Sequence, residues 1–535
     1  MRLNEQGLQD RAIWEAKGYA LPAFDRRAMI EATEEAPVWV HFGAGNIFRA
    51  FHAALAQKML EKGSMSSGIV VAEGFDYEII SKSYAPHDNY SVLVTLKADG
   101  SIEKTVIGSI ARSAQLDSAN EEEYSYLKKV FTADSLQMAT FTITEKGYSL
   151  VRGDGSLIPD VEADFAAGPE RPASYMGKVA SLLYARYAAG AKPVAMVSTD
   201  NCSHNGDKLY AAIHRFAEEW TKAGRADAGF LAYVEDPAKV SFPWSMIDKI
   251  TPRPDASVEE ILKNDGLEEL APVVTSRNTY VAPFVNAEES EYLVIEDAFP
   301  NGRPALEEAG VIFTERETVD KVERMKVCTC LNPLHTSLAV FGCLLGYTRI
   351  SDEMKDEDLV KLVRRAGYVE GLPVVTDPGV IDPKGFIDTV VNVRIPNPFM
   401  PDTPQRIATD TSQKLAIRFG ETIKAYEASD ALNVADLKAI PLVFAGWLRY
   451  LMGVDDGGKA FERSSDPMLE EAGAAVAGLK LGAENDLSAV DALLKRADIF
   501  GVDLFEAGLA DEVKANLAKM LAGEGAVRST LHEAF

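Results

Sequence analysis

The segment from Val38 to Ala72 limits the folds open to this chain more than any other part of the sequence. An apolar, β-rich run at 38–42 ends in Gly43-Ala44-Gly45, and a second short apolar run follows at 68–72. Between them, apolar residues recur at helical spacing, namely Ile47, Phe51, Leu55 and Met59. Strand, tight turn, helix and strand in this order predict a βαβ unit, and such units form parallel sheets.

The pattern of the chain changes near residue 305. Before it, strands are predicted at 90–96, 138–144 and 193–197, with helices at 122–131 and 175–187. After it, long amphipathic stretches dominate, at 333–345, 359–365, 411–427, 439–452, 487–497 and 510–521. A chain of 535 residues also exceeds the usual size of one hydrophobic core. We therefore predict the α/β class, with a Rossmann-type domain of mostly parallel sheet at residues 1–304 and a largely α-helical domain at residues 305–535.

Composition and charge indicate which binding partners and which cellular location to expect. With 81 acidic against 55 basic residues the net charge is −26, which repels nucleic acid. The four cysteines lack the spacing of zinc or redox motifs, and the first ten residues lack the apolar core of a signal peptide. The apolar runs are too short to span a membrane. These features predict a cytoplasmic protein, and they leave open a monomer or a small homo-oligomer.

The glycine turn is a candidate dinucleotide site. Glycines at 43 and 45 allow the backbone to approach a pyrophosphate, and the helix N-terminus after them supplies N–H donors, so Gly43, Gly45, Asn46 and Arg49 are candidate cofactor-binding residues. Phe48 occupies the position of the third glycine in the usual fingerprint, and a plain glycine-rich turn explains the spacing equally well. An acid after the second strand would bind the ribose hydroxyls and favour NAD over NADP, and both Glu73 and Asp76 qualify.

A second candidate site lies between Glu323 and His335. A carboxylate, an amine (Lys326), an amide (Asn332) and an imidazole fall within thirteen residues. Removing a proton from an alcohol while a hydride leaves its carbon requires a base, donors to the developing oxyanion and a positioning group, and this cluster contains all three. The structural alternatives are an ordinary ion pair between Glu323 and Lys326 and a helix start at Asn332.

Two further groups of polar residues extend the candidate site. Asp200, Asn201 and their neighbours follow the strand at 193–197, where open α/β sheets bind ligands. Asp248 lies in the dense motif at 242–252, and Arg406 and Lys414 are two basic groups suited to a hydroxyl-rich or carboxylate substrate. Turn formation, a single buried acid and exposed charges are the respective structural alternatives.

These motifs, in their order along the chain, resemble those of the polyol-specific long-chain dehydrogenases. The resemblance rests on His-Phe-Gly43-x-Gly45-Asn-x-x-Arg49, Thr142-Ile-Thr-Glu145-x-Gly147-Tyr148, Asp200-Asn201-x-x-His204-Asn205-Gly206, Phe242-Pro-x-x-Met246-x-Asp248-x-Ile-Thr-Pro252, the cluster from Glu323 to His335, and Arg406 with Lys414. This family includes mannitol 2-dehydrogenases, fructuronate reductases and tagaturonate reductases. The resemblance spans about residues 38 to 420.

The resemblance implies a role for each matching residue. Lys326 is similar to the family's general base, Asn201 and Asn332 to its paired amide donors, and His335 to a substrate-positioning residue. Glu323 resembles the acid that connects the base to solvent. Asp248, Arg406 and Lys414 match substrate contacts. The resemblance also implies NAD(H) or NADP(H) and no catalytic metal.

One spacing departs from the family pattern. The family usually places four residues between its Lys and Asn, whereas five lie between Lys326 and Asn332. On a straight α-helix the extra residue turns Lys326 by about 100° from the site. Either a π-bulge or non-helical break within 327–331 absorbs this residue, or Lys326 is not the base.

These observations predict an NAD-dependent secondary-alcohol dehydrogenase that interconverts D-fructuronate plus NADH and D-mannonate. The preference for a sugar acid rests on overall similarity and on Arg406 and Lys414. Mannitol 2-dehydrogenase and tagaturonate reductase activities are the enzymatic alternatives. A regulatory or binding protein that retains an idle scaffold is the alternative from another class, motivated by the unusual spacing.

Overall fold

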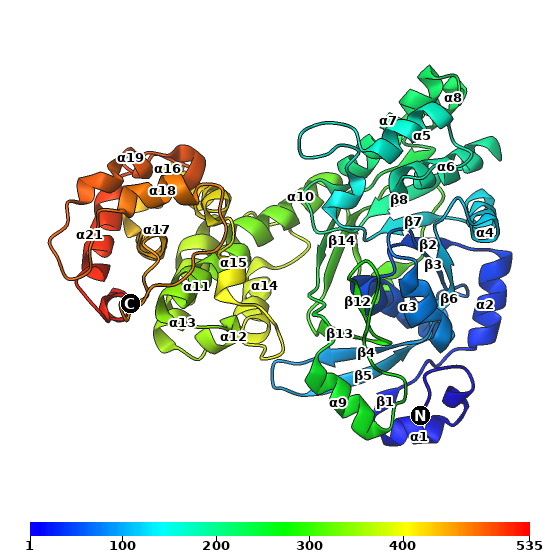
Figure 1. Ribbon diagram of the computed structural model, residues 1–535, viewed down its shortest axis with the longest axis horizontal. Coiled ribbons are helices and arrows are strands. Elements are labelled where there is room, and N and C mark those ends of the chain that lie inside the picture. The colour runs from blue at the N-terminus through cyan, green and yellow to red at the C-terminus, as the bar shows by residue number, and fades with distance from the viewer. The chain divides into compact units, whose positions relative to one another are not determined.

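The computed structural model describes residues 1–535 and contains two compact units (Figure 1). The first comprises residues 1–97 and 101–320, and the second residues 98–100 and 321–535. The first is built on a six-stranded sheet in the order β6-β3-β2-β7-β8-β9, in which every pair is parallel. Its strands are β2 (Trp39–Phe42), β3 (Ile69–Glu73), β6 (Ile110–Gln115), β7 (Met138–Phe141), β8 (Val194–Ser198) and β9 (Val240–Ser241). The predicted Rossmann-type sheet is thus confirmed.

Side chains of this sheet alternate between two apolar layers. Val40, Phe42 and Val70 point to the layer under α4 (Glu121–Thr132), α6 (Tyr175–Ala188), α7 (Asn205–Lys222) and α8 (Ala228–Glu235). Trp39 and Val71 point to the layer that contains α3 (Ala53–Lys62) and strands of a second sheet. Because both faces are covered, β2, β3 and β8 are buried along their whole length, as parallel strands usually are.

The strand order defines where ligands can bind. β3 and β6 continue from β2 to one side, and β7, β8 and β9 to the other. The crevice at the carboxyl ends of β2 and β7 is therefore the topological switch point, the usual ligand site of open α/β sheets.

Smaller sheets and helices complete the first unit. A mixed sheet has the order β1 (Tyr19–Ala20), β5 (Ile102–Ile107), β4 (Ser91–Leu96) and β13 (Phe284–Glu288). Two others contain β10 (Ser245–Asp248), β14 (Tyr292–Glu296) and β15 (Ile312–Thr314), and β11 (Val273–Val274) with β12 (Tyr280–Val281). The remaining helices are α1 (Arg11–Ala16), α2 (Arg26–Glu35), α5 (Pro159–Ala167) and α9 (Ala256–Asp265). The first unit continues past residue 304 because β15 pairs with β14.

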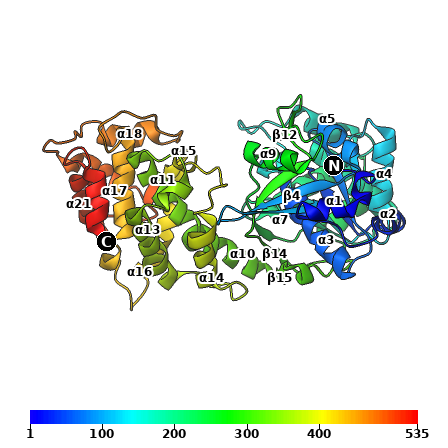
Figure 2. The same cartoon turned by 90° about the horizontal axis from the view of Figure 1, so that it is seen from below.

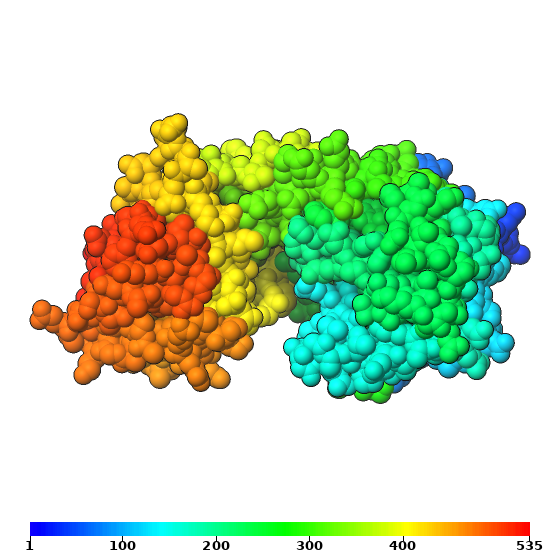
Figure 3. Space-filling view, turned by 90° about the horizontal axis from the view of Figure 1, so that it is seen from above, coloured from blue at the N-terminus to red at the C-terminus, as the bar shows by residue number.

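The second unit is helical, as predicted. In it α17 (Ala439–Leu451), buried at every position, packs against α11 (Asn332–Leu345) and α21 (Ala510–Met520) (Figure 2). The surrounding helices are α12 (Ile350–Glu353), α13 (Glu357–Arg364), α14 (Pro383–Thr389), α15 (Pro404–Ile407), α16 (Glu421–Glu427), α18 (Leu469–Val476), α19 (Asp491–Leu494), α20 (Ala497–Phe500) and α22 (Ala526–Ala534). Figure 3 shows the C-terminal segment, in red, on the surface of this unit.

One continuous helical segment, Arg316–Leu345, is long and apolar enough to cross a membrane by length and composition. It consists of α10 (Arg316–Met325), a π-helical turn (Lys326–Cys330) and α11. Of its apolar window, 83% is buried inside the protein, as in the core helix of a folded domain.

Candidate active site

The glycine turn lies at the switch point, directly after β2. Gly43 has a φ of +105°, and a Cβ there would lie 2.2 Å from the carbonyl oxygen of Thr142, so only glycine fits. A Cβ on Gly45 would meet no atom within 4 Å, which leaves the backbone open on that side. A helix begins at Asn46, and its first N–H groups have no partner within the helix. These features fit the pyrophosphate of a dinucleotide.

Arg49 supports this turn from inside the protein. Its side chain is buried; Nη1 donates to the carbonyl of Ala282 at 2.6 Å, and Nη2 donates to Oδ1 of Asn46 at 3.0 Å. Burial lowers the pKa of the guanidinium. In the structure Arg49 therefore positions the side chain of Asn46, and its guanidinium faces protein groups.

The two predicted ribose acids have different partners. Glu73, at the end of β3, accepts bonds from the N–H groups of Ala44 at 2.8 Å, Phe75 at 2.7 Å and Asp76 at 3.0 Å. Burial raises the pKa of Glu73, and these three N–H donors counteract part of that rise. The carboxylate of Asp76 accepts from the hydroxyl of Thr275 at 2.5 Å. Only Glu73 thus bonds to the glycine turn itself.

The loop after β8 is fastened to the loop after β7 by one carboxylate. Asp200 accepts from the N–H groups of Ile143 at 2.9 Å and Thr144 at 2.8 Å, and from the hydroxyl of Tyr148 at 2.6 Å. These bonds join the motif at 142–148 to the motif at 200–206. Asn201, the predicted amide donor, comes next in the chain and is exposed at the carboxyl edge of the sheet.

Asn205 joins the same loop to the strand that contains Asp248. Its amide nitrogen donates to the carbonyls of Asp200 and Ser245, each at 3.0 Å, and its oxygen accepts from the N–H of Ser245 at 3.0 Å. Asp248 is buried at the end of β10, opposite Tyr292 of β14. Asp200 and Asn205 therefore hold the loops together. The sequence alone did not distinguish this structural role from the role predicted for Asn201.

A π-turn, Lys326–Cys330, lies between Glu323 and His335. It can absorb the extra residue between Lys326 and Asn332. The N–H of Leu331 donates to the carbonyl of Lys326 at 3.1 Å, five residues earlier, and Leu331 departs from helical torsion angles, with φ −131° and ψ −62°. Pro333 has no N–H, and its ring would clash with the carbonyl of Thr329 in a regular α-helix. A π-turn takes up one extra residue, so the helix on either side keeps its register.

The members of the cluster differ in exposure. Lys326 is buried, whereas Glu323, Asn332 and His335 are partly exposed. Asn332 and His335 are three residues apart in the first turn of α11, so they share one face of that helix. Thr336, in the same turn, donates its hydroxyl to the carbonyl of Asn332 at 3.1 Å.

Comparison with known families covers both units. The model of the mannitol dehydrogenase Rossmann domain matches residues 38–308, and that of the mannitol dehydrogenase C-terminal domain matches residues 318–521. The chain belongs to the mannitol dehydrogenase family. As a member of it, the protein is a nicotinamide-dependent secondary-alcohol dehydrogenase.

Individual relatives within the mannitol dehydrogenase family extend this result. The D-mannonate oxidoreductase of Thermotoga maritima is 51% identical, over 100% of this chain and 99% of that protein. The mannitol 2-dehydrogenase of Pyrenophora tritici-repentis is 30% identical over 81% of this chain and 72% of its own. Among solved structures, Pseudomonas fluorescens mannitol 2-dehydrogenase in complex with NAD and D-mannitol aligns over 100% of this chain and 99% of that chain, with a TM-score of 0.68 and 26% identity. A substrate-free D-sorbitol dehydrogenase matches the fold over the full length of both chains, with a TM-score of 0.77 and 24% identity.

The two basic residues that match family substrate contacts have distinct environments. Arg406 is exposed and forms an ion pair with Asp402, so its charge is already balanced in the structure. Lys414 is half-buried, and its amine donates to the carbonyls of Ile407, at 3.2 Å, and Thr409. Burial and the nearby Arg418 guanidinium lower the pKa of Lys414. Sequence reasoning missed Arg418, whose only signal is its position four residues after Lys414.

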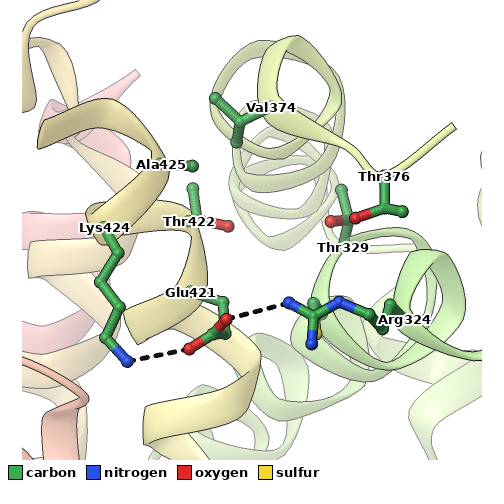
Figure 4. Close-up of a pocket in the computed structure, with 9 residues that line it drawn as sticks. Arg324, Thr329, Val374, Thr376, Glu421, Thr422, Lys424 and Ala425 are labelled. Atoms are coloured by element: carbon green, nitrogen blue, oxygen red, sulfur yellow. Dashed lines mark hydrogen bonds and ion pairs between the residues drawn. The ribbon is translucent and has the colours of Figure 1, made fainter. Parts of the chain in front are cut away.

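A pocket of about 290 Å³ is lined in part by Cys328 and Thr329 of the π-turn (Figure 4). Its two cations share one acid, because Glu421 pairs with Arg324 at 3.1 Å and with Lys424 at 2.9 Å. None of the predicted site residues lines this pocket.

Proposed function

We propose that this member of the mannitol dehydrogenase family reduces D-fructuronate to D-mannonate with NADH, and catalyses the reverse oxidation. The observation that carries the proposal is the 51% identity to a D-mannonate oxidoreductase over both units. The π-turn supports it, because it removes the spacing anomaly that favoured an idle scaffold. The family members at about 30% identity include mannitol 2-dehydrogenases, which makes mannitol and fructose the second candidate pair.

When bound, NADH would supply the hydride that reduces the ketone carbon, leaving NAD⁺. The ammonium of Lys326 gives its proton to the ketone oxygen, so that a secondary alcohol forms; in the oxidation direction the neutral amine takes that proton back. Glu323, one turn earlier on the same helix, is proposed to return a proton from solvent to Lys326.

The remaining roles are assigned residue by residue. The amide groups of Asn332 and Asn201 are proposed to donate hydrogen bonds to the developing oxyanion, and His335 to orient a substrate hydroxyl. Asp248 and Lys414 are proposed as further substrate contacts, with Arg406 available only if its ion pair with Asp402 opens.

Residues of the glycine turn would hold the dinucleotide. The open side of Gly45 and the N–H groups after it suit the pyrophosphate, and Asn46 is kept in place by Arg49. The carboxylate of Glu73 next to this turn, with Asp76 nearby in the chain, supports NAD over NADP, since a 2′-phosphate would meet negative charge. We further propose a cytoplasmic monomer or small homo-oligomer whose partner is a sugar acid or polyol, without nucleic acid, membrane or metal.

Oxidation of NADH and of NADPH should be followed with D-fructuronate, D-tagaturonate and D-fructose side by side. The proposal predicts the highest kcat/KM with NADH and D-fructuronate. A higher kcat/KM with D-tagaturonate or D-fructose would replace the proposed substrate, and a preference for NADPH would replace the proposed cofactor. No turnover with any of the three would overturn the enzymatic assignment.

A further inference from the structure

Arg418 is a largely buried cation with no anionic partner. It lies in the π-helical turn Ala416–Gly420 of the second unit, and its Nη1 donates to the hydroxyl of Thr336. That neutral hydroxyl is its one hydrogen-bond partner, and no carboxylate lies within 4 Å of the guanidinium. Burial alone lowers the pKa of Arg418, to about 10, with no acidic neighbour to raise it.

The remaining donors of Arg418 are open. Nε and Nη2 bond to no protein atom, and neither is sealed from solvent. Other buried arginines of the chain differ: Arg186 donates five hydrogen bonds to backbone carbonyls, and both terminal nitrogens of Arg449 are bonded to carbonyls. The free edge between Nε and Nη2 matches the spacing of the two oxygens of a carboxylate.

The location of this free edge relates it to the catalytic helix. Thr336, which accepts from Arg418, in turn donates to the carbonyl of Asn332, so Arg418 is fixed to the first turn of α11 beside His335. Lys414 lies near enough that the two cations repel each other, which contributes to the lowered pKa of Lys414. Lys414 also has the carboxylates of Asp410 and Asp466 nearby, whereas Arg418 has none, so the cation that is left to attract an anion is Arg418.

We propose that Arg418 binds the carboxylate of the substrate and thereby determines the preference for sugar acids over neutral polyols. This inference rests on the proposed function. Arg406, exposed and paired with Asp402, is the poorer candidate for this role. The ketone to be reduced then lies at the other end of the sugar chain, near Asn332 and Lys326.

The test compares Arg418→Gln and Arg418→Lys with wild type and with Arg496→Gln, a control that removes only exposed ion pairs. We expect Arg418→Gln to raise the KM for D-fructuronate about 10- to 100-fold, since one charge-assisted contact is lost, and to leave the KM for D-fructose unchanged. Arg418→Lys should recover part of this loss, because lysine keeps the positive charge but lacks the paired N–H donors of the guanidinium. In calorimetric titration the Kd for D-mannonate should rise by a similar factor.

Two kinds of result would overturn the inference. An unchanged KM for D-fructuronate in Arg418→Gln excludes a carboxylate contact, and an equal loss with D-fructose, accompanied by a lower Tm, indicates a purely structural role. If wild type reduces no uronate, the proposed function fails; the Arg418 inference is then decided by the titration with D-mannonate, where an unchanged Kd in Arg418→Gln overturns it.

Discussion

Shortening the π-turn by one residue should preserve catalysis, and lengthening it should not. Deleting Val327, the partly exposed member of the turn, leaves four residues between Lys326 and Asn332, which is the spacing usual in the family. Because a π-turn accommodates its extra residue without changing the register of the flanking helix, the deletion should leave Lys326 and Asn332 in the same relative orientation, while the break that Pro333 imposes at Leu331 remains.

Inserting one alanine after Thr329 should instead change the orientation of Lys326 relative to Asn332. The insertion rotates Lys326 by about 100° and moves it by about 1.5 Å along the helix relative to Asn332. Since a displacement of about 1 Å at a reacting group can reduce the rate about 100-fold, kcat should fall by at least that factor. For the deletion, kcat should stay within about tenfold of wild type, a smaller change than such a misplacement causes.

The assay is NADH oxidation with D-fructuronate, together with thermal unfolding to show that both variants fold. A third variant with one alanine inserted after Gly346, beyond the end of α11, controls for any effect of chain length. If the deletion abolishes turnover in a folded protein while the insertion retains it, the reasoning about register is wrong.

Three further predictions concern catalysis and stability. Lys326→Ala should lower kcat by orders of magnitude while NADH binding, measured by fluorescence, persists; retained turnover would identify another base. Glu353 is a buried carboxyl with both oxygens unpartnered, and burial raises its pKa to about 9. Because this native pKa lies above the unfolded value, stability is lost as pH rises from about 4.5 towards 9, by about 3 kcal/mol at pH 7. In urea unfolding, the free energy of unfolding of Glu353→Gln relative to wild type should therefore increase by about that amount from pH 4 to pH 7. The same difference between variant and wild type at both pH values would refute this. His52 has a pKa lowered by burial to about 3. The imidazole of His52 stays neutral in the folded protein but is protonated in the unfolded chain at pH 5. The free energy of unfolding should therefore be about 2 kcal/mol lower at pH 5 than at pH 7 because of this residue, and that difference should be smaller in His52→Gln.

The fold was predictable where local pattern determines it. The run at 38–42, the glycines at 43 and 45 and the helical spacing after them act within one βαβ unit, and the structure contains that unit. The stretch 411–427 was expected as one amphipathic segment but divides into a 3₁₀ turn, a π-turn and α16. Hydrophobic spacing alone does not distinguish these helical forms, because they differ in hydrogen-bond partners.

The site was predictable as a set of motifs but not as a set of roles. Asp200 and Asn201 are adjacent in the sequence, yet one carboxylate holds two loops together while the next side chain is exposed. Arg406 and Arg418 are both basic residues near Lys414, but Arg406 pairs with Asp402, four residues earlier, whereas Arg418 bonds to Thr336. The partners of Asp200 and Arg418 are distant in sequence, so local pattern does not reveal them. The five-residue spacing before Asn332 was the exception, since it predicted either a helix irregularity within 327–331 or another base, and the structure contains a π-turn there.

The most direct test of the proposed mechanism is a crystal structure of the protein with NAD and D-mannonate bound. We predict that Nζ of Lys326 lies about 2.6–3.2 Å from the reacting oxygen, with the amide of Asn332 also donating to that oxygen. Another side chain in the position of the base, or Lys326 and Asn332 directed away from the same substrate oxygen, would contradict the proposed mechanism.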